Sequence, residues 1–400
     1  MFLEILIAIL LGVTAGTFTG LVPGVHVNLI AAGLLSFSVV LLTITSPLLV
    51  AVFVVAMSVT HSFVSVIPAI FLGAPESGDA LGVLPGHRLL HQGQGLFAVQ
   101  LTVIGSFIAV IISFVLFPFF VMVVVHGYDI IQPYIKYGII AVVAFMILRD
   151  RYKVWAFVVF AISGLLGYVV LRNPSIENPL FPLLSGLFGI ATLLYSLRGK
   201  SFFPAQKEKK NVLEIILAGK ALSAGCVSGF ITAVLPGLGS GMASTLASQL
   251  VRNIGDKGFM LLIGSISTFN FNLSLVTYYV IDRARNGSII TVQQILSSFG
   301  FQELGVLLIT ILIAGSCSVY VTLLFSRAFL SFISRVSYIK LVLSIMCCIT
   351  AMAFILGGWY GLLILVVASA VGLIPAIVKT TRTMGMGCLI VPILLFFFGF

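Results

Sequence analysis

Long apolar runs separated by short polar breaks dominate this chain of 400 residues. Residues 5–75 contain no Asp, Glu, Lys or Arg, which is enough chain for about three membrane crossings at ~20 residues each. The pattern therefore predicts an all-α polytopic membrane protein. Cutting at charged or Gly/Pro-rich breaks predicts seven apolar segments on each side of a polar linker, at roughly 2–22, 25–46, 47–72, 96–125, 130–148, 154–171 and 180–197, then 212–235, 237–251, 258–281, 303–326, 341–357, 359–378 and 383–400.

One pattern of glycine, threonine and proline occurs twice, and each residue of the second copy lies 213 positions after its counterpart. Proline removes a backbone donor and the following glycine loosens the chain, so each copy is expected to break a membrane helix in mid-course. Segments 1–46 and 212–251 are each either two full spans or a re-entrant hairpin. The two copies consist of Gly12, Gly16, Thr19, Pro23 and Gly24, and of Gly225, Gly229, Thr232, Pro236 and Gly237.

The number of segments before the linker sets the relative orientation of the two halves. Seven is odd, so the second half enters the membrane from the opposite face. We therefore predict a first inverted repeat at 1–197, a cytoplasmic linker at 198–211 and a second inverted repeat at 212–400. Broken helices in corresponding positions of two such repeats point to the binding site of a transporter.

Composition and charge agree with a membrane protein and argue against other classes. Hydrophobic residues make up 60% of the chain, charged residues 8%, and the mean hydropathy is +1.25. The net charge of +10 comes from basic residues in short loops, which set membrane topology and do not indicate a nucleic-acid partner. Glu4 near the start favours a retained span over a signal peptide. We expect a multi-pass protein of the cell membrane.

The repeated segments carry groups suited to an anionic substrate. A helix that begins after each Pro-Gly break presents unpaired N–H groups and the positive end of its dipole, which favour a carboxylate without a lysine or arginine. Side-chain hydrogen bonds would add to this. For Gly12, Gly16, Gly225 and Gly229, close helix packing is the favoured interpretation. The predicted substrate-binding residues are Thr19, Pro23, Gly24, His26, Asn28, Thr232, Pro236, Gly237, Gly239, Ser240, Ser244 and Thr245.

Further polar residues follow each repeated segment. Polar side chains inside a bilayer are costly unless they meet a partner or a cavity, so they either line a pathway or form hydrogen bonds between helices. The asparagine carbonyls suit a small coupling cation, Na⁺ or H⁺ being the candidates, while the acids fit either cation coupling or a helix cap. These pathway or coupling candidates are Thr60, His61, Ser65, Glu76, Ser77, Asp79, Asn270 and Asn272. His87 and His91 lack a third ligand and fit an exposed cytoplasmic turn, so we expect no metal site and no cofactor.

These motifs together resemble the TctA-type large membrane subunit (permease) of the tripartite tricarboxylate transporter family. The resemblance rests on Pro23-Gly24 and Pro236-Gly237 in their glycine-rich surroundings, on Pro68 to Pro85-Gly86, and on Pro375 with the run from Met386 to Pro392. It implies a secondary transporter of di- or tricarboxylates driven by a cation gradient. It also implies an extracytoplasmic substrate-binding protein and a small membrane subunit as partners. Gly73 to Gly78 and His26 depart from the pattern of the family.

Two other classes of function compete with a carboxylate permease. An enzyme is not expected, because a serine-hydrolase elbow around Ser240 would need glycines where Leu238 and Met242 stand, and the chain contains no HExxH motif. The paired hairpins also fit a translocase of a lipid phosphate such as polyprenyl phosphate, since phosphate and carboxylate use the same helix-end chemistry.

Overall fold

The computed structural model describes residues 2–22, 34, 42–72, 83–173, 179–197, 206, 214–234, 243–244, 247, 251, 254–282, 284, 286–296, 298–333 and 337–399. This part of the chain consists of helices and their connections, without a strand. The helices are α1 (Phe2–Leu21), α4 (Pro47–Val64), α5 (Val66–Leu72), α6 (Val83–His91), α7 (Gly95–Val115), α8 (Phe117–Ile131), η1 (Gln132–Tyr134), α9 (Ile135–Arg149), α10 (Lys153–Leu171), α11 (Leu180–Leu184), η2 (Ser185–Ile190), α12 (Ala191–Ser196), α13 (Ile215–Val234), α15 (Gly255–Ile281), α16 (Gly287–Ile295), α17 (Phe301–Ile333), α18 (Tyr338–Val378), η3 (Arg382–Met386) and α19 (Gly387–Phe398).

Within the described ranges, nine helical segments are long and apolar enough to cross a membrane. The predicted all-α polytopic membrane fold is therefore confirmed. Two shorter apolar helical stretches, Leu180–Tyr195 and Arg382–Phe398, accompany them. The predicted segments 25–46 and 237–251 lie largely outside the described residues, so the count of seven segments in each half and the inversion inferred from it stay predictions.

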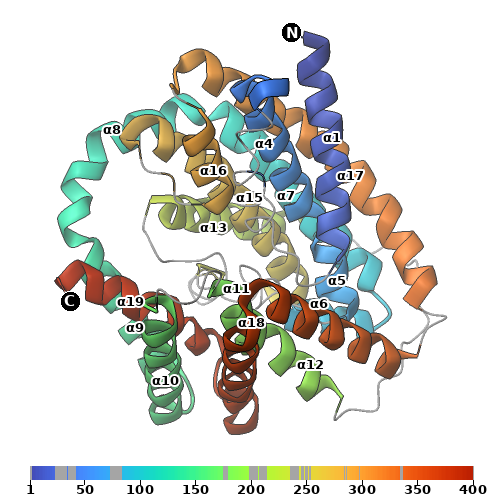
Figure 1. Cartoon of the computed structure of the whole chain (residues 1–400), viewed down its shortest axis with the longest axis vertical. Coiled ribbons are helices and arrows are strands. Elements are labelled where there is room, and N and C mark those ends of the chain that lie inside the picture. Colours follow the sequence, from blue (N-terminus) through green and yellow to red (C-terminus); the bar gives the residue numbers. More distant parts are fainter. Residues whose placement is uncertain are drawn as a thin grey trace.

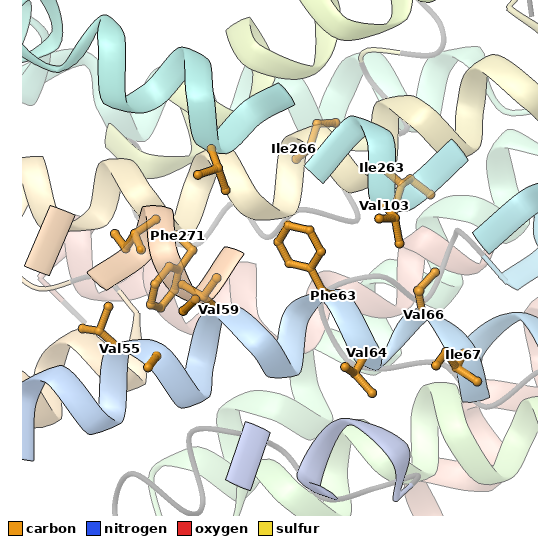
Figure 2. Close-up of a cluster of buried hydrophobic side chains, with 14 of the residues drawn as sticks. Val55, Val59, Phe63, Val64, Val66, Ile67, Val103, Ile263, Ile266 and Phe271 are labelled. Atoms are coloured by element: carbon orange, nitrogen blue, oxygen red, sulfur yellow. The ribbon is translucent and has the colours of Figure 1, made fainter. Parts of the chain in front are cut away.

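Two helical segments form the centre of the molecule. In both Pro47–Leu72 (α4 and α5) and α15, 83% of the most apolar stretch is buried, against 56% or less for the other spans. Figure 2 shows why: Val59 and Phe63 of α4 lie in one apolar cluster with Val103 of α7 and Ile266 of α15. The two central spans therefore face other helices, whereas the less buried spans expose more of their apolar surface.

A break at Ser65 divides the first central span into α4 and α5. Pro68 lies one turn later and has no N–H for the carbonyl of Val64. Its ring also clashes with that carbonyl in a regular helix, which accounts for the interruption at Ser65.

The helix α1 lies against α4 along a stripe of glycines. A Cβ atom added at Gly12 would lie 2.7 Å from the Phe53 carbonyl oxygen and 2.7 Å from Ala56 Cβ. One further along, at Gly20, would lie 2.9 Å from Val64 Cβ. The backbones are therefore too close for any other residue, and the two helices run in the same direction because their contacts advance together.

The pair α13 and α15 repeats this packing. A Cβ atom added at Gly225 would lie 3.2 Å from the Leu262 carbonyl oxygen, and one at Gly229 would lie 2.9 Å from Phe269 Cβ. Each contact on α15 is 209 positions after its counterpart on α4, as Leu262 is after Phe53. The favoured interpretation of the repeated glycines, close helix packing, is confirmed in both copies.

Each central helix also packs against a helix from the other half of the chain. The α7 helix runs along α15, where Ser106 Oγ donates to the Gly264 carbonyl at 3.1 Å. The α17 helix runs along α4 and α5, with the rings of Phe71 and Phe329 6.2 Å apart. Figure 1 shows α1, α4, α7 and α17 side by side on one flank of the molecule. The central spans thus hold the two halves together.

A second group of helices lies apart from this flank. Figure 1 shows α9, α10 and α19 together near the C-terminus, at the lower left of the view. Here α10 packs on α19 so closely that a Cβ atom at Gly167 would overlap the backbone of Cys388. Buried apolar residues from α8, α9, α11 and α18 complete the core of this group.

The structure corrects some predicted boundaries and confirms another. The predicted segment 96–125 is not one helix, because α7 ends at Val115 and α8 begins at Phe117. Pro118, in the first turn of α8, cannot continue the hydrogen-bond ladder of α7. The predicted junction between 341–357 and 359–378 is confirmed, since Gly358 interrupts α18 with φ 56° and ψ −145°.

Candidate functional site

The structure describes eight of the predicted site residues, namely Thr19, Thr60, His61, Ser65, Thr232, Ser244, Asn270 and Asn272. The other predicted site residues lie outside the described part of the chain: Pro23, Gly24, His26, Asn28, Glu76, Ser77, Asp79, Pro236, Gly237, Gly239, Ser240 and Thr245. The predicted roles of both groups are therefore proposals, and the structure places only the first group.

A buried polar pair joins the last turn of α1 to α4. Thr19 Oγ1 lies 3.0 Å from His61 Nδ1, and the Thr19 hydroxyl is also 3.1 Å from the Gly16 carbonyl. Thr19 is 4% exposed and His61 is 2% exposed. Thr19 is thus fixed four residues before Pro23, where the first Pro-Gly break is predicted.

An equivalent pair joins the last turn of α13 to α15. Asn270 Nδ2 donates to Thr232 Oγ1 at 2.8 Å, and the Thr232 hydroxyl donates to the Gly229 carbonyl at 3.1 Å. Thr232 follows Thr19 by 213 positions and Asn270 follows His61 by 209, the same offsets as the glycine contacts. The two halves therefore share a threonine hydrogen-bonded to one side-chain nitrogen of the central helix, which belongs to His61 in one half and to Asn270 in the other.

Two further pairs, both buried, link the halves to each other, and each contains a serine that was not among the predicted site residues. Ser318 of α17 donates to Thr60 Oγ1 at 3.0 Å. Asn272 Nδ2 donates to Ser113 Oγ of α7 at 2.6 Å. The two pairs are not counterparts in the repeat, because Thr60 and Asn272 are 212 positions apart whereas equivalent contacts on the central helices are 209 apart.

The Asn272 pair leaves one oxygen unsatisfied. Asn272 is 2% exposed, and its Oδ1 has no hydrogen-bond partner in the described part of the chain. The Ser113 hydroxyl cannot supply that bond, because it donates to the Val110 carbonyl at 2.9 Å. A buried acceptor without a donor is unfavourable unless a water or an ion reaches it.

Ser65 lies at a small cavity between the two halves. The cavity has a volume of about 20 Å³, which is room for about one water molecule. Several of its hydroxyl groups donate to helix carbonyls, as Ser62 does to Val59 at 2.7 Å and Thr102 to Ala98 at 3.1 Å. Their oxygen atoms therefore remain as acceptors. The lining residues are Ser62, Ser65, Val66, Ala69, Ile70, Thr102, Ser106, Met260, Ile263, Gly264 and Ser267.

The prediction of an exposed turn at the two histidines is wrong for His87, which lies part-buried within α6, whereas His91 is exposed at the last residue of that helix, directly before a turn. His87 and His91 belong to α6, which packs on α5: a Cβ atom at Gly86 would lie 2.9 Å from Ile70 Cγ1. His87 Nδ1 donates to the Ile70 carbonyl at 3.0 Å, and burial lowers the pKa of His87. The two imidazole rings meet edge to face, 5.0 Å apart. Within the described ranges, no group of three His, Cys, Asp or Glu side chains is placed to hold a metal.

An ion pair joins the two halves at the end of the central helices where α6 lies. Arg88 of α6 donates through Nε to one carboxylate oxygen of Asp256 at 2.9 Å and through a terminal nitrogen to the other at 2.5 Å. Asp256 lies in the first turn of α15, where the helix dipole favours a negative charge. Nearby, Gln206 of the linker donates to the Leu90 carbonyl at 3.2 Å, so the linker reaches the same end.

Comparisons with known proteins agree with this architecture. The chain matches the tripartite tricarboxylate transporter TctA family over residues 6–387. It is also 28% identical, over 98% of both chains, to a protein of Methanocaldococcus jannaschii named Uncharacterized protein MJ1079. No solved structure matches the chain. Since the family match covers nearly the whole sequence, this multi-pass membrane protein belongs to the tripartite tricarboxylate transporter TctA family, whose members work with a binding protein and a small membrane subunit.

Proposed function

We propose that this chain is the permease of a secondary transporter in the cell membrane, which carries small di- or tricarboxylates with Na⁺ or H⁺. The observation that carries this proposal is the repeated pair of Thr19 with His61 and Thr232 with Asn270. Each pair anchors the end of a helix directly before a predicted Pro-Gly break. Helix ends fixed in this way suit the capture of an anion by backbone N–H groups.

We also propose that the two halves are inverted copies. The contacts between α1 and α4, and those between α13 and α15, run in the same direction along each pair. The start of α7, at Gly95, lies beside Phe71 at the end of α5, so α7 runs back along the first central span. Because α15 follows the direction of α7, the second central helix opposes the first. This arrangement supports a pathway between two oppositely directed hairpins.

The coupling ion is proposed to bind among the oxygen acceptors of the central helices. Asn272 Oδ1 is buried without a donor among the described residues. At the Ser65 cavity, the hydroxyls of Ser62, Thr102 and Ser106 donate to helix carbonyls, so their oxygens remain as acceptors. Small hard cations prefer oxygen ligands of this kind. The proposal therefore places coupling at Asn270, Asn272 and Ser65.

Uptake of labelled citrate or succinate into proteoliposomes tests the anion site. Gly24→Leu and Gly237→Leu are expected to abolish uptake, because a bulky side chain blocks approach to the backbone amides. Gly138→Leu is the matched control, since a Cβ atom there would meet nothing within 4 Å. Full uptake by both site variants would refute the carboxylate site.

Two further measurements separate coupling and substrate class. Uptake should require an imposed Na⁺ or H⁺ gradient, and the uptake rate should fall in the Asn272→Ala variant. If the uptake rate is the same with and without both gradients, coupling is rejected. Inhibition of the purified protein by polyprenyl phosphate, with no effect of free di- or tricarboxylates, would instead favour a lipid-phosphate translocase.

A further inference from the structure

A basic cavity lies where the turn between α9 and α10 meets the end of α18. Its volume is about 180 Å³. Three of its lining residues are positively charged and one is negatively charged. The lining consists of Met146, Arg149, Asp150, Arg151, Lys379, Thr381 and Met384.

The single carboxylate of the cavity accepts hydrogen bonds from neutral donors. Asp150 accepts hydrogen bonds from the Thr381 backbone N–H at 3.0 Å, from the Thr381 hydroxyl, and from the Tyr152 backbone N–H at 2.8 Å. Partial burial acts to raise the pKa of Asp150, but these hydrogen bonds together hold it below its ordinary value. Asp150 therefore stays charged and ties the two turns together.

The three cations of the cavity have no ion pair in the described part of the chain. The Arg149 guanidinium lies 5.6 Å from the centre of the Phe145 ring, and that of Arg151 lies 5.5 Å from the centre of the Tyr152 ring. Stacking on a ring leaves the in-plane N–H groups of an arginine free to bind an anion. With Lys379, the cavity thus offers several donors and an excess of positive charge.

Three candidate membrane spans begin or end at the cavity, which is where we expect the lipid head groups. The span Phe117–Arg149 ends there, Lys153–Leu171 begins there, and Val342–Val378 ends immediately before Lys379. Trp155, one of the residues favoured at the membrane interface, is 46% exposed just inside the second of these spans.

The neighbours of the cavity on the spans are apolar and uncovered. Leu148 is 65% exposed, Val154 is 75% exposed and Ile377 is 58% exposed. Each stands within three residues of a cavity-lining cation along the chain. Charged groups therefore adjoin a surface suited to hydrocarbon chains, a combination that a water-soluble anion does not need.

We propose that Arg149, Arg151 and Lys379 bind the phosphate of an anionic phospholipid, whose acyl chains lie along Leu148, Val154 and Ile377. Basic pockets between membrane helices recognise such head groups. Arginine is suited to phosphate because it donates two parallel hydrogen bonds, and lysine adds a point charge. The lipid joins the α9–α10 turn to the end of α18.

The test compares lipid binding by the full-length protein and by two matched double variants. Arg149→Gln with Lys379→Gln removes two charges from the cavity, and Arg327→Gln with Lys340→Gln removes two exposed charges elsewhere. Binding of phosphatidylglycerol and of phosphatidylcholine to detergent-purified protein is followed by native mass spectrometry. We expect the cavity variant to bind phosphatidylglycerol at least tenfold more weakly than the wild type does, and the control variant to bind it as the wild type does. All three proteins are expected to bind phosphatidylcholine equally.

Other outcomes overturn the proposal. Equal loss of phosphatidylglycerol binding in both double variants would mean general attraction to net charge. Unchanged binding in the cavity variant would place the lipid elsewhere. Thermal stabilisation by inorganic phosphate that equals the stabilisation by phosphatidylglycerol, and that disappears in the cavity variant, would assign the cavity to a soluble anion. If the cavity variant is not monodisperse on gel filtration, the single variant Arg151→Gln replaces it. We then expect a partial loss of phosphatidylglycerol binding, and unchanged binding would contradict the proposal.

Discussion

At the residue scale, four hydrogen-bonded pairs, three of them buried and the pair of Thr232 and Asn270 part-buried, give the interior its polar character. Thr19 pairs with His61 and Thr232 with Asn270, each within one half of the chain. Ser113 pairs with Asn272 across the halves, as Ser318 does with Thr60. Hydrogen bonds between membrane helices contribute about 0.6 kcal/mol each to stability on average. The main effect of these pairs is therefore to specify which helices contact each other, and their contribution to the stability of the fold is small.

The pair of Ser113 and Asn272 allows a direct measurement. A double-mutant cycle with Ser113→Ala and Asn272→Ala should give a coupling free energy of about 0.6 to 1.7 kcal/mol in unfolding experiments in detergent. Ser316→Ala is the control partner, because the exposed Ser316 hydroxyl donates only to the Leu312 carbonyl of its own helix. A coupling as small as that between Ser316 and Asn272 would show that the buried contact is energetically irrelevant.

The equivalence of His61 and Asn270 predicts which substitution the first pair tolerates. His61→Asn should retain a melting temperature close to that of the wild type, because an asparagine amide takes the position of the imidazole Nδ1 and meets Thr19 as Asn270 meets Thr232. His61→Leu should lower the melting temperature, since it removes the side-chain hydrogen-bond partner of the buried Thr19 hydroxyl. Equal melting temperatures for both variants would contradict the equivalence.

At the scale of elements, glycines determine how closely α1 approaches α4 and how closely α13 approaches α15. Backbone and side-chain atoms of the central helices occupy the positions that a Cβ atom would take at Gly12 and Gly225. This is the small-residue packing typical of membrane helices, where dispersion forces replace the hydrophobic effect between helices. The glycine stripe thus sets the position of the helix end that carries Thr19 or Thr232.

Larger side chains in the stripe should therefore separate the helices. Gly16→Val and Gly229→Val are each expected to cost about 1 to 3 kcal/mol of stability, because each introduces an overlap with the central helix. Gly219→Val is the matched control in α13, where a Cβ atom meets nothing within 4 Å. The readouts are the melting temperature and the monodisperse fraction after extraction; stripe variants that behave like Gly219→Val would argue against close packing.

At the scale of the whole molecule, the halves are bound together through their central spans and, at one end, by the ion pair of Arg88 and Asp256. The side chains of this pair are 58% and 27% exposed, so the pair adds at most about 1 kcal/mol to stability. Because the pair joins α6 of one half to α15 of the other, the distance between its two side chains reports on any movement of the halves at this end.

Transport by relative movement of the two halves predicts that a covalent link at this pair stops uptake. Arg88→Cys with Asp256→Cys, in a variant lacking the five natural cysteines, should lose carboxylate uptake on treatment with a cleavable thiol crosslinker and regain it after cleavage. Each single cysteine variant, treated in the same way, is the control. Undiminished uptake by the fully crosslinked protein would exclude movement at this end.

Composition and periodicity were sufficient to establish the class of this protein. Apolar runs with few charges have to lie in a bilayer, and backbone groups in a bilayer have to bond within helices, so an all-helical multi-pass fold followed from composition and periodicity. The repeat of Gly12 and Gly16 at Gly225 and Gly229 also predicted the close helix pairs, because only glycine permits that approach. Gly358 was predicted as a break for a similar local reason.

The tertiary structure alone decided which polar side chains meet. Ser113 and Asn272 are far apart in the sequence, and no local pattern states that α7 crosses to the central helix of the other half. The ends of α7 and α8 were misplaced because an apolar run continues through Leu116, where only the missing N–H of Pro118 marks the change. Likewise, the cavity of Arg149 and Lys379 exists only because folding brings two distant turns together. Burial is encoded by local composition, whereas partners depend on how the helices pack.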